Sequence, residues 1–238
     1  MAGSGGLVFA GAGVSAQASE NGEVNIAVTS GNNLTAGKAV DIAALNAPAV
    51  KAVTGALSGS LLASAAVTVA QANIGTEAKH LKTSVTIGDN NVLAAETISV
   101  KAENNAKQDV DMQALSISAS PFPGGAAQIN SGGSSIYSDV TVDAGSNVYR
   151  GKALGENNYG TADLLLEAGN SVSQKVRASG ISAGTAFATG TNLAATQAVL
   201  TTKVTAAGSK AGSHINDLTV NAKSYAAIDS EANGYGGA

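Results

Sequence analysis

The sequence predicts an all-β fold, a β-solenoid built from about four imperfect repeats of 54–69 residues. Three observations lead to this prediction. A strand-like segment recurs four times, short turns rich in Gly, Asn and Asp separate the strand-like segments, and the apolar residues are mostly small or aliphatic. Of the 238 residues, 44% are hydrophobic but only 3% are aromatic. We therefore expect a thin, regular core filled by Ala, Val, Ile and Leu.

The recurring strand has the same pattern in each copy. Its first, third, fifth and seventh residues are a large aliphatic residue, a second large aliphatic residue, Ala, and Asn or Ser. The copies are "VDIAALN" (40–46), "ISVKAEN" (98–104), "LLLEAGN" (164–170) and "LTVNAKS" (218–224). The intervals between their starts are 98 − 40 = 58, 164 − 98 = 66 and 218 − 164 = 54. Because side chains two residues apart share one face of a strand, the pattern predicts one buried face in every copy.

A second marker has a similar period. Gln follows small residues at four places, Gln17, Gln71, Gln128 and Gln197. The intervals between them are 71 − 17 = 54, 128 − 71 = 57 and 197 − 128 = 69. Together the two markers predict one elongated unit over residues 1–238. Its approximate repeats are 6–54, 55–112, 113–180 and 181–238.

Shorter strands and turns lie between the markers. "VTIG" (85–88) and "VTV" (140–142) are followed by the polar turns "DNN" (89–91) and "DAGSN" (143–147). Parallel stacking of coils about 4.8 Å apart would bury the apolar face that one repeat cannot bury alone. A repeat of about 58 residues fits three coils of about 19 residues or one very wide coil, and both remain open.

Two Ala-rich segments, 60–72 and 193–207, also suit a helix by propensity. We predict strands there, because both segments are rich in Thr and Val and lack the charge pairs that steady an exposed helix.

Asn ends the first three copies of the recurring strand. Asn46, Asn104 and Asn170 share the inward parity of the aliphatic residues. If the copies stack directly, their amides form a hydrogen-bonded ladder. If other coils separate them, each Asn caps its own bend.

The composition argues against several classes of function. A net charge of −4 without a Lys/Arg cluster argues against nucleic-acid binding. The apolar stretch 61–72 is too short and too interrupted to cross a membrane. Residues 1–14 lack the basic start of a signal peptide, and we interpret them as the opening of an excised fragment. The absence of cysteine and of calcium-binding motifs predicts no disulfide, metal or cofactor.

Enzymatic groups are sparse. Asp109 with Asp111, and Asp139 with Asp143, have the parity of paired carboxylates, but neither pair recurs in the other repeats. The arginines and histidines are scattered along the chain, at Arg150, Arg177, His80 and His214. We expect both histidines to lie in solvated turns. Thr does not recur as the T-x-T rows of an ice-binding solenoid. We predict that the chain is not an enzyme, and keep a polysaccharide lyase or hydrolase as the alternative.

The third repeat is the longest and contains irregular segments, "SPFPGG" (120–125) and "YRGKALGENNY" (149–159). Insertions in repeat proteins emerge as loops and often bind partners. Aromatic side chains stack on sugars or anchor protein interfaces. The predicted binding residues are Phe122, Tyr149, Arg150, Lys152 and Tyr159. The alternative is that both segments are loops without a ligand.

The stretches "VTIGDNNVLAAETISVKAENNA" (85–106) and "VTSGNNLTAGKAVDIAALNAPA" (28–49) resemble the repetitive passenger regions of large bacterial surface adhesins. These are filamentous-haemagglutinin-like proteins, autotransporters and leukotoxin-type filamentous adhesins. The resemblance implies a right-handed parallel β-helix in a secreted protein anchored at the outer membrane. It also implies cell-surface glycans or proteins as partners. We therefore expect a rigid spacer with adhesive loops, and open solenoid ends predict end-to-end self-association.

Overall fold

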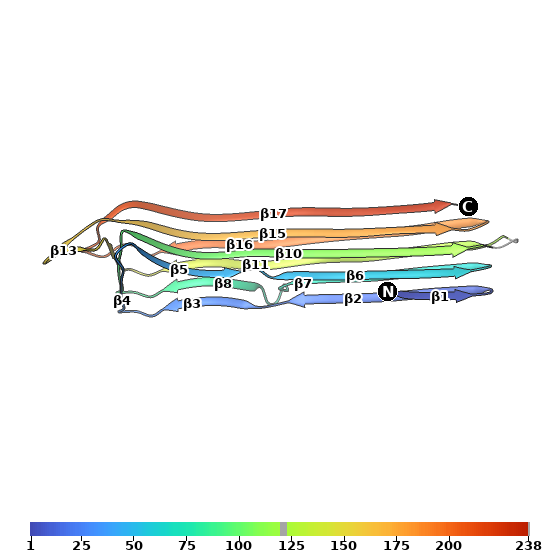
Figure 1. The fold of residues 1–238 in the computed structure, drawn as a ribbon, viewed down its shortest axis with the longest axis horizontal. Coiled ribbons are helices and arrows are strands. Elements are labelled where there is room, and N and C mark those ends of the chain that lie inside the picture. Colours follow the sequence, from blue (N-terminus) through green and yellow to red (C-terminus); the bar gives the residue numbers. More distant parts are fainter. Residues whose placement is uncertain (120–122, 238) are drawn as a thin grey trace.

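The computed structural model describes residues 1–119 and 123–237, and this part of the chain is all-β. Its strands lie in two long parallel sheets, which give the molecule an elongated shape (Figure 1). The described residues contain no helix.

Strands of one long sheet, sheet A, all run in the same direction. They are β1 (Ala2–Gly6), β5 (Ala39–Asn46), β6 (Ala49–Ser60), β10 (Thr97–Ser118), β15 (Ala162–Ala183) and β17 (Ile215–Gly237). The other long sheet, sheet B, contains β2 (Phe9–Glu20), β3 (Glu23–Val28), β7 (Ala63–Ile74), β8 (Leu81–Ile87), β11 (Gly125–Ala144) and β16 (Phe187–Ala206). A small sheet C at one end contains β4 (Asn33–Thr35), β9 (Val92–Ala94) and β12 (Val148–Arg150).

The chain traverses sheet A, returns along sheet B, crosses sheet C and then begins sheet A again, and we call one such circuit a pass. Each pass adds a strand parallel to the preceding one. The register aligns Val40, Ile98, Leu164 and Leu218, so the four copies of the recurring strand are direct neighbours. One repeat is therefore one wide pass and not three short coils.

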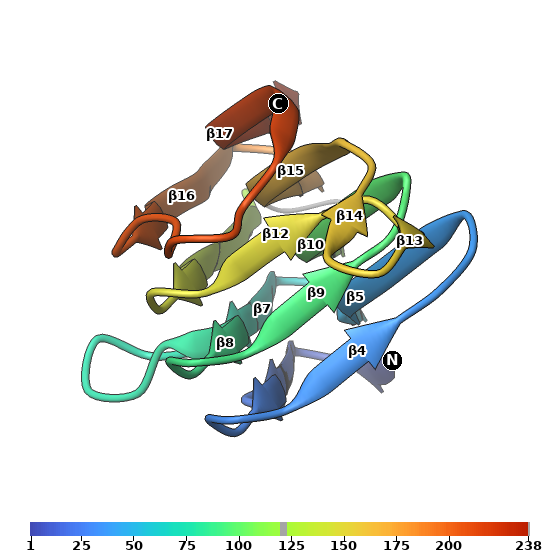
Figure 2. The same cartoon turned by 90° about the vertical axis from the view of Figure 1, so that its left-hand side faces the viewer.

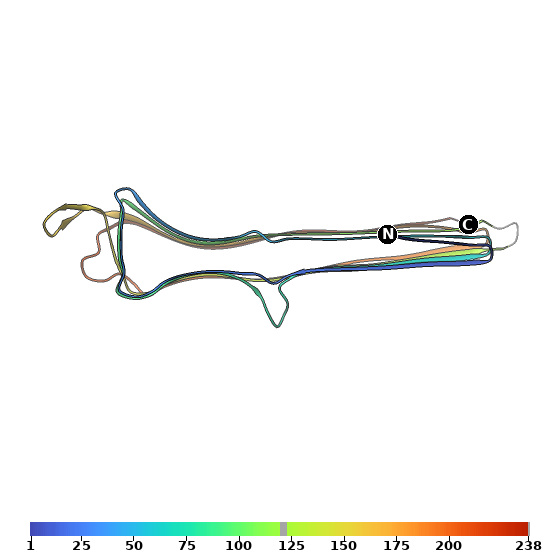
Figure 3. The same cartoon turned by 60° about the horizontal axis from the view of Figure 1, so that its bottom comes forward.

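The core changes character along the strands. Near sheet C it consists of aliphatic side chains such as Val85, Leu93, Val100 and Leu166. Toward the opposite end it contains Ala and buried polar residues, including Ser58, Thr68 and Asn130. The two layers lie closer together at that end (Figure 3), because small side chains fill less space.

The Ala-rich segments predicted as strands are strands. Residues 63–72 lie in β7 and residues 193–206 lie in β16, where both pair with β11. Ladder hydrogen bonds to a neighbouring strand outweigh the helical preference of Ala, because intrinsic propensity is small compared with tertiary pairing.

Two segments depart from the uniform passes. Residues 75–80 bulge between β7 and β8, visible as the downward loop in Figure 3. A short antiparallel hairpin, β13 (Ala153–Gly155) with β14 (Asn158–Tyr159), extends beyond the small sheet at the end of the molecule (Figure 2).

Candidate binding site

The hairpin is a ten-residue insertion in the third pass. Ala94 and Thr97 are 97 − 94 = 3 positions apart, whereas their register partners Arg150 and Asp163 are 163 − 150 = 13 apart, which is 13 − 3 = 10 more. The hairpin base is closed by backbone hydrogen bonds from Gly151 N to Gly160 O (2.7 Å) and from Gly160 N to Lys152 O (3.0 Å). Asn157 occupies the left-handed region at the tip, with φ of 55°. The insertion is therefore a defined hairpin on a rigid base.

Basic and aromatic side chains meet at the hairpin. The guanidinium carbon of Arg150 lies 3.4 Å from the ring centroid of Tyr159, a cation–π contact. Lys152 Nζ lies 3.5 Å from Glu96 Oε1, so an ion pair links the hairpin to the segment preceding β10. Three of the predicted binding residues, Arg150, Lys152 and Tyr159, therefore lie close together.

Residues 152–158 of the hairpin are exposed, and this stretch includes its tip. Leu154 is 61% exposed, and Glu156, Asn157 and Asn158 are also exposed. An apolar side chain beside amides and a carboxylate can contact both the faces and the hydroxyl groups of a sugar, or a protein loop. Sequence reasoning selected the insertion but emphasised its aromatic residues and missed these tip residues.

Tyr149 is not a surface residue, and its predicted place in an exposed binding patch needs correction. It is 3% exposed and packs in the aliphatic core. Its neighbours in sheet C, Leu34 and Leu93, occupy the same register position. Burial raises the pKa of the Tyr149 hydroxyl, and the hydrogen bond from Asn147 Nδ2 (3.4 Å) opposes this shift. Period-2 alternation within β12 turns Tyr149 inward and Arg150 outward. Phe122 lies outside the described residues.

The strand-end Asn residues stack in register. Asn46, Asn104 and Asn170 are direct neighbours across three passes. Asn104 Nδ2 donates to Asn170 Oδ1 (3.0 Å) and to Ser138 Oγ in the opposite sheet (3.0 Å). Asn104 and Asn170 therefore form one rung of the predicted ladder and also link the two layers. Asn46 Nδ2 and Asn104 Oδ1 have no hydrogen-bond partner among the described residues, so the ladder does not continue to Asn46.

The four Gln residues do not form one stack. Gln17 and Gln71 are register neighbours on the exposed face. The register partner of Gln71 on β11 is Gly133. Gln128 lies five residues before Gly133 and is buried on the opposite face. Gln197 pairs with Ser135. Six residues join β10 to β11 but only two join β6 to β7, so the register offset rises from 58 between β6 and β10 to 62 between β7 and β11. Gln128 follows Gln71 by 57 residues, and the odd difference of 62 − 57 = 5 places the two side chains on opposite faces.

Sequence reasoning missed a second Asn ladder, at the turn before sheet C. The N–H of Asn32 donates to Asn91 Oδ1 (2.8 Å), and the N–H of Asn91 donates to Asn147 Oδ1 (2.8 Å). Asn91 Nδ2 also donates to the Gly88 carbonyl of its own turn (2.7 Å). The signal is present in "GNN", "DNN" and "GSN", which end at residues 33, 91 and 147. Taken one at a time, these segments predict only tight turns.

An apolar row crosses the outer face of sheet A and was also missed. Leu57, Leu115, Ile181 and Tyr235 are successive register neighbours, spaced like the recurring strand. They line a shallow groove of about 460 Å³. Smaller residues, such as Gly55, form its remaining wall.

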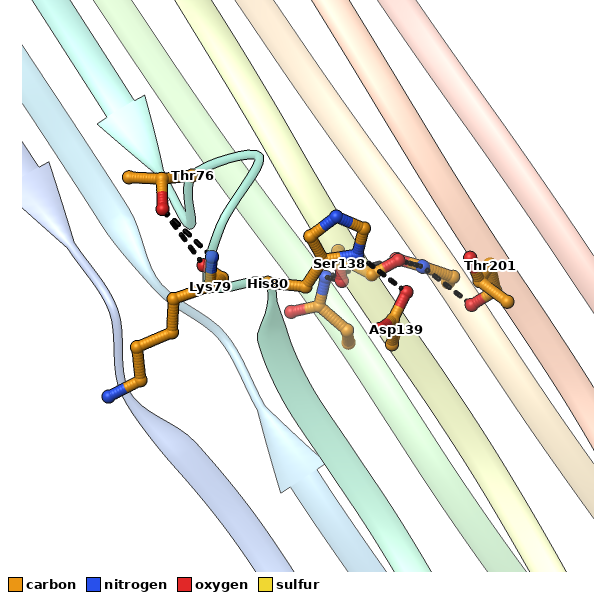
Figure 4. A network of polar contacts seen from close by, with 8 residues as sticks. Thr76, Lys79, His80, Ser138, Asp139 and Thr201 are labelled. Atoms are coloured by element: carbon orange, nitrogen blue, oxygen red, sulfur yellow. Dashed lines mark hydrogen bonds and ion pairs between the residues drawn. The ribbon is translucent and has the colours of Figure 1, made fainter.

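A His–Asp pair holds the bulge between β7 and β8 (Figure 4). His80 Nδ1 lies 2.9 Å from Asp139 Oδ1. The His80 ring also lies 5.5 Å from the ring of Tyr137. Thr76 and Lys79 close the bulge through reciprocal backbone hydrogen bonds of 2.7 and 3.1 Å. The sequence predicts a solvated turn for His80, but this side chain anchors its turn to β11.

One member of each predicted carboxylate pair contacts a basic side chain. Asp109 forms an ion pair with Lys51 (3.1 Å), and Asp139 contacts His80. Residues 1–119 and 123–237 contain no cluster of three or more His, Cys, Asp and Glu residues arranged to hold a metal ion. The same residues include no helix long and apolar enough to span a membrane.

The chain matches no family model, no curated protein and no solved structure in the comparisons with known proteins.

Proposed function

We propose that this chain is a structural and adhesive segment of a secreted bacterial surface adhesin, built as a right-handed parallel β-helix with very wide coils. The observation that carries the proposal is the in-register stacking of 40–46, 98–104, 164–170 and 218–224. Consecutive passes that share columns of side chains are the arrangement expected of a solenoid. The likeness of 28–49 and 85–106 to adhesin passenger regions supplies the biological role.

The dimensions define what kind of spacer this is. The 22 residues of β15 span about 73 Å at about 3.3 Å per residue. Each further pass adds only about 4.8 Å along the stacking direction. The segment is therefore a stiff slab that holds the hairpin at one end of its long dimension. Stiffness comes from ladder hydrogen bonds that continue through every pass.

In this proposal the hairpin tip binds cell-surface glycans or proteins. A hydrogen bond between Gly151 and Gly160 closes the base of the hairpin. The ion pair of Lys152 with Glu96 links the hairpin to the slab, so little ordering free energy is lost when a ligand binds. Leu154 offers an apolar contact, and Asn157 and Asn158 offer amide donors and acceptors.

Binding to a glycan array and to intact bacterial and host cells tests the proposal. The variant replaces residues 152–159 by an Asn-Gly turn between Gly151 and Gly160, because these glycines are already hydrogen-bonded and suit a two-residue hairpin. Tyr149 and Arg150 stay in place, so the core is unchanged. We expect binding by the native chain and loss of binding by the variant.

A matched control replaces the bulge residues 76–79 instead, which lie on another loop. Equal binding by the native chain and the hairpin variant would refute the hairpin as the adhesive site. No binding by either protein would leave the slab as a spacer without an adhesive loop.

A further inference from the structure

The last strand, β17, has an apolar face that the described residues leave uncovered. Leu164 and Leu166 of β15 are 4% and 1% exposed. Their register neighbours on β17, Leu218 and Val220, are 55% and 51% exposed. β15 faces β16 across the core, whereas no sheet B strand follows β17 in the described chain. In the described chain, β17 begins a fifth pass and therefore has no sheet B strand of its own pass opposite it.

The first pass has the complementary form. Its sheet B half is present as β2 and β3, but its sheet A half is the five-residue β1 alone. Val24, Ile26 and Val28 on β3 are only partly buried against the aliphatic core. Among the described strands, β5 pairs only with β10, so its other edge is open. Among the described strands, β2 and β3 therefore have no full-length sheet A strand of their own pass opposite them.

We propose that two copies of this chain stack head to tail, and that the last pass of one copy and the first pass of the next form one complete pass. β17 of one copy pairs in parallel with β5 and β6 of the next, and β16 pairs with β2 and β3. Val24 and Ile26 of the second copy then cover Leu218 and Val220 of the first. This inference rests on the stacked-pass architecture proposed above, and it names a second copy as the partner of the open ends.

Charge complementarity supports the register. One column on sheet A reads Lys51, Asp109, Lys175 and Asp229 from the second pass to the fifth. Ion pairs join its first two members (3.1 Å) and its last two (3.8 Å). A following copy places its Lys51 beside Asp229, so the alternation continues across the junction. Opposite charges on neighbouring strands favour pairing, whereas like charges oppose it.

The second Asn ladder, at the turn before sheet C, predicts the same register between the two copies. Asn147 is bridged to Ser209 in the fourth pass, which places Ser209 in the position of Asn32, Asn91 and Asn147. In each earlier step the N–H of one pass donates to the Asn Oδ1 of the next. The Ser209 N–H of one copy therefore faces Asn32 Oδ1 of the next.

Two features oppose the junction and make it testable. β1 occupies the columns that the end of β17 would take, because Gly3 and Tyr235 both align with the row of Leu57. This Ala-Gly-Ser-Gly-Gly strand must leave when a second copy binds. Glu20 lies in the inward column of Ile74, and stacking would bury its carboxylate. Inward-pointing charges are a known protection of sheet edges.

Sedimentation velocity and light scattering over a wide concentration range provide the test. We expect multiples of 23.1 kDa that increase with concentration. Deletion of residues 1–6, or Glu20→Gln, is expected to shift assembly to at least tenfold lower concentration. Both changes remove an obstacle and add no new contact.

Variants blocked at one end distinguish this interface from a symmetric dimer. Val220→Lys blocks the β17 end and Ile26→Lys blocks the β3 end, with Leu218→Lys and Val24→Lys as second choices. We expect each variant to be monomeric alone and the mixture to form a heterodimer and nothing longer. Circular dichroism at the β-sheet minimum checks that each variant folds.

A native chain that stays monomeric at every concentration overturns the proposal. So does a dimer that never grows, or association that persists in both blocked variants. The readout is mass and involves no glycan or cell. The variant lacking the hairpin is expected to assemble like the native chain, so failure of adhesion and failure of assembly are separate results.

Discussion

The backbone N–H of Asn91 donates to Oδ1 of Asn147 across 2.8 Å, which joins the second and third passes at the turn before sheet C. Asn91 Oδ1 in turn accepts a hydrogen bond from the backbone N–H of Asn32 in the first pass. Each amide also holds its own turn, through Gly88 for Asn91 and Gly145 for Asn147. One residue type therefore shapes the turn and fixes the stacking of passes.

Asn91→Ala is expected to lower the free energy of unfolding by about 2 kcal/mol, because it leaves the N–H of Asn32 and the carbonyl of Gly88 without their partner. Urea unfolding followed by circular dichroism measures the change. Asn158→Ala on the exposed hairpin is the control and is expected to change stability little. Equal effects of the two substitutions would contradict a structural role for the ladder.

Tyr149 predicts a loss of stability at alkaline pH. Its hydroxyl has a pKa raised above the ordinary 10.0 by burial, so the folded state holds the proton more tightly than the unfolded state. The stabilisation is complete below that ordinary value and is lost as pH rises through the folded pKa. Tyr149→Phe is expected to flatten the alkaline decline of the unfolding free energy.

Tyrosinate absorbance gives an independent check of the same residue. At the alkaline end of the titration, the native protein is expected to gain absorbance that Tyr149→Phe lacks. An identical alkaline decline and absorbance gain in both proteins would show that the buried ring does not cause the effect.

Gly75 begins the bulge in the left-handed region, with φ of 66°. A Cβ there would overlap the Tyr137 carbonyl oxygen and lie 2.8 Å from the backbone nitrogen of Leu81. Gly75→Ala is expected to cost about 2 kcal/mol of folding free energy through strain and overlap. Gly155→Ala is the control, because nothing lies within 4 Å of its Cβ position. Thermal unfolding of both variants measures the difference, and equal midpoints would contradict the strain.

Arg150→Ala is expected to loosen the hairpin without unfolding the slab. The substitution removes the cation–π contact with Tyr159, which is worth about 0.5–1 kcal/mol at an exposed site. We expect faster tryptic cleavage after Lys152 and an almost unchanged thermal midpoint. Arg177→Ala, on sheet A away from the hairpin, is the control. Unchanged cleavage after Lys152 would mean that the contact does not order the hairpin.

The sequence by itself determined the all-β class and the alignment of the recurring strand. Large aliphatic residues, Ala and Asn at alternate positions predict one buried face in every copy and make Val40, Ile98, Leu164 and Leu218 equivalent positions, which the structure places in one column. The spacing also located the insertion that became the hairpin. These features can be predicted from the sequence because they depend on the period of the hydrophobic pattern within a segment and on the number of residues between similar segments.

Only the tertiary structure decided the width of a pass, the burial of Tyr149 and the face of Gln128. Each depends on turn lengths, such as the six residues between β10 and β11, and on which strand lies opposite across the core. It also brought His80 to Asp139, 59 residues apart, and left Leu218 and Val220 exposed at the end of the stack. These are contacts between distant segments, and local hydrophobic pattern carries no information about which distant segments meet.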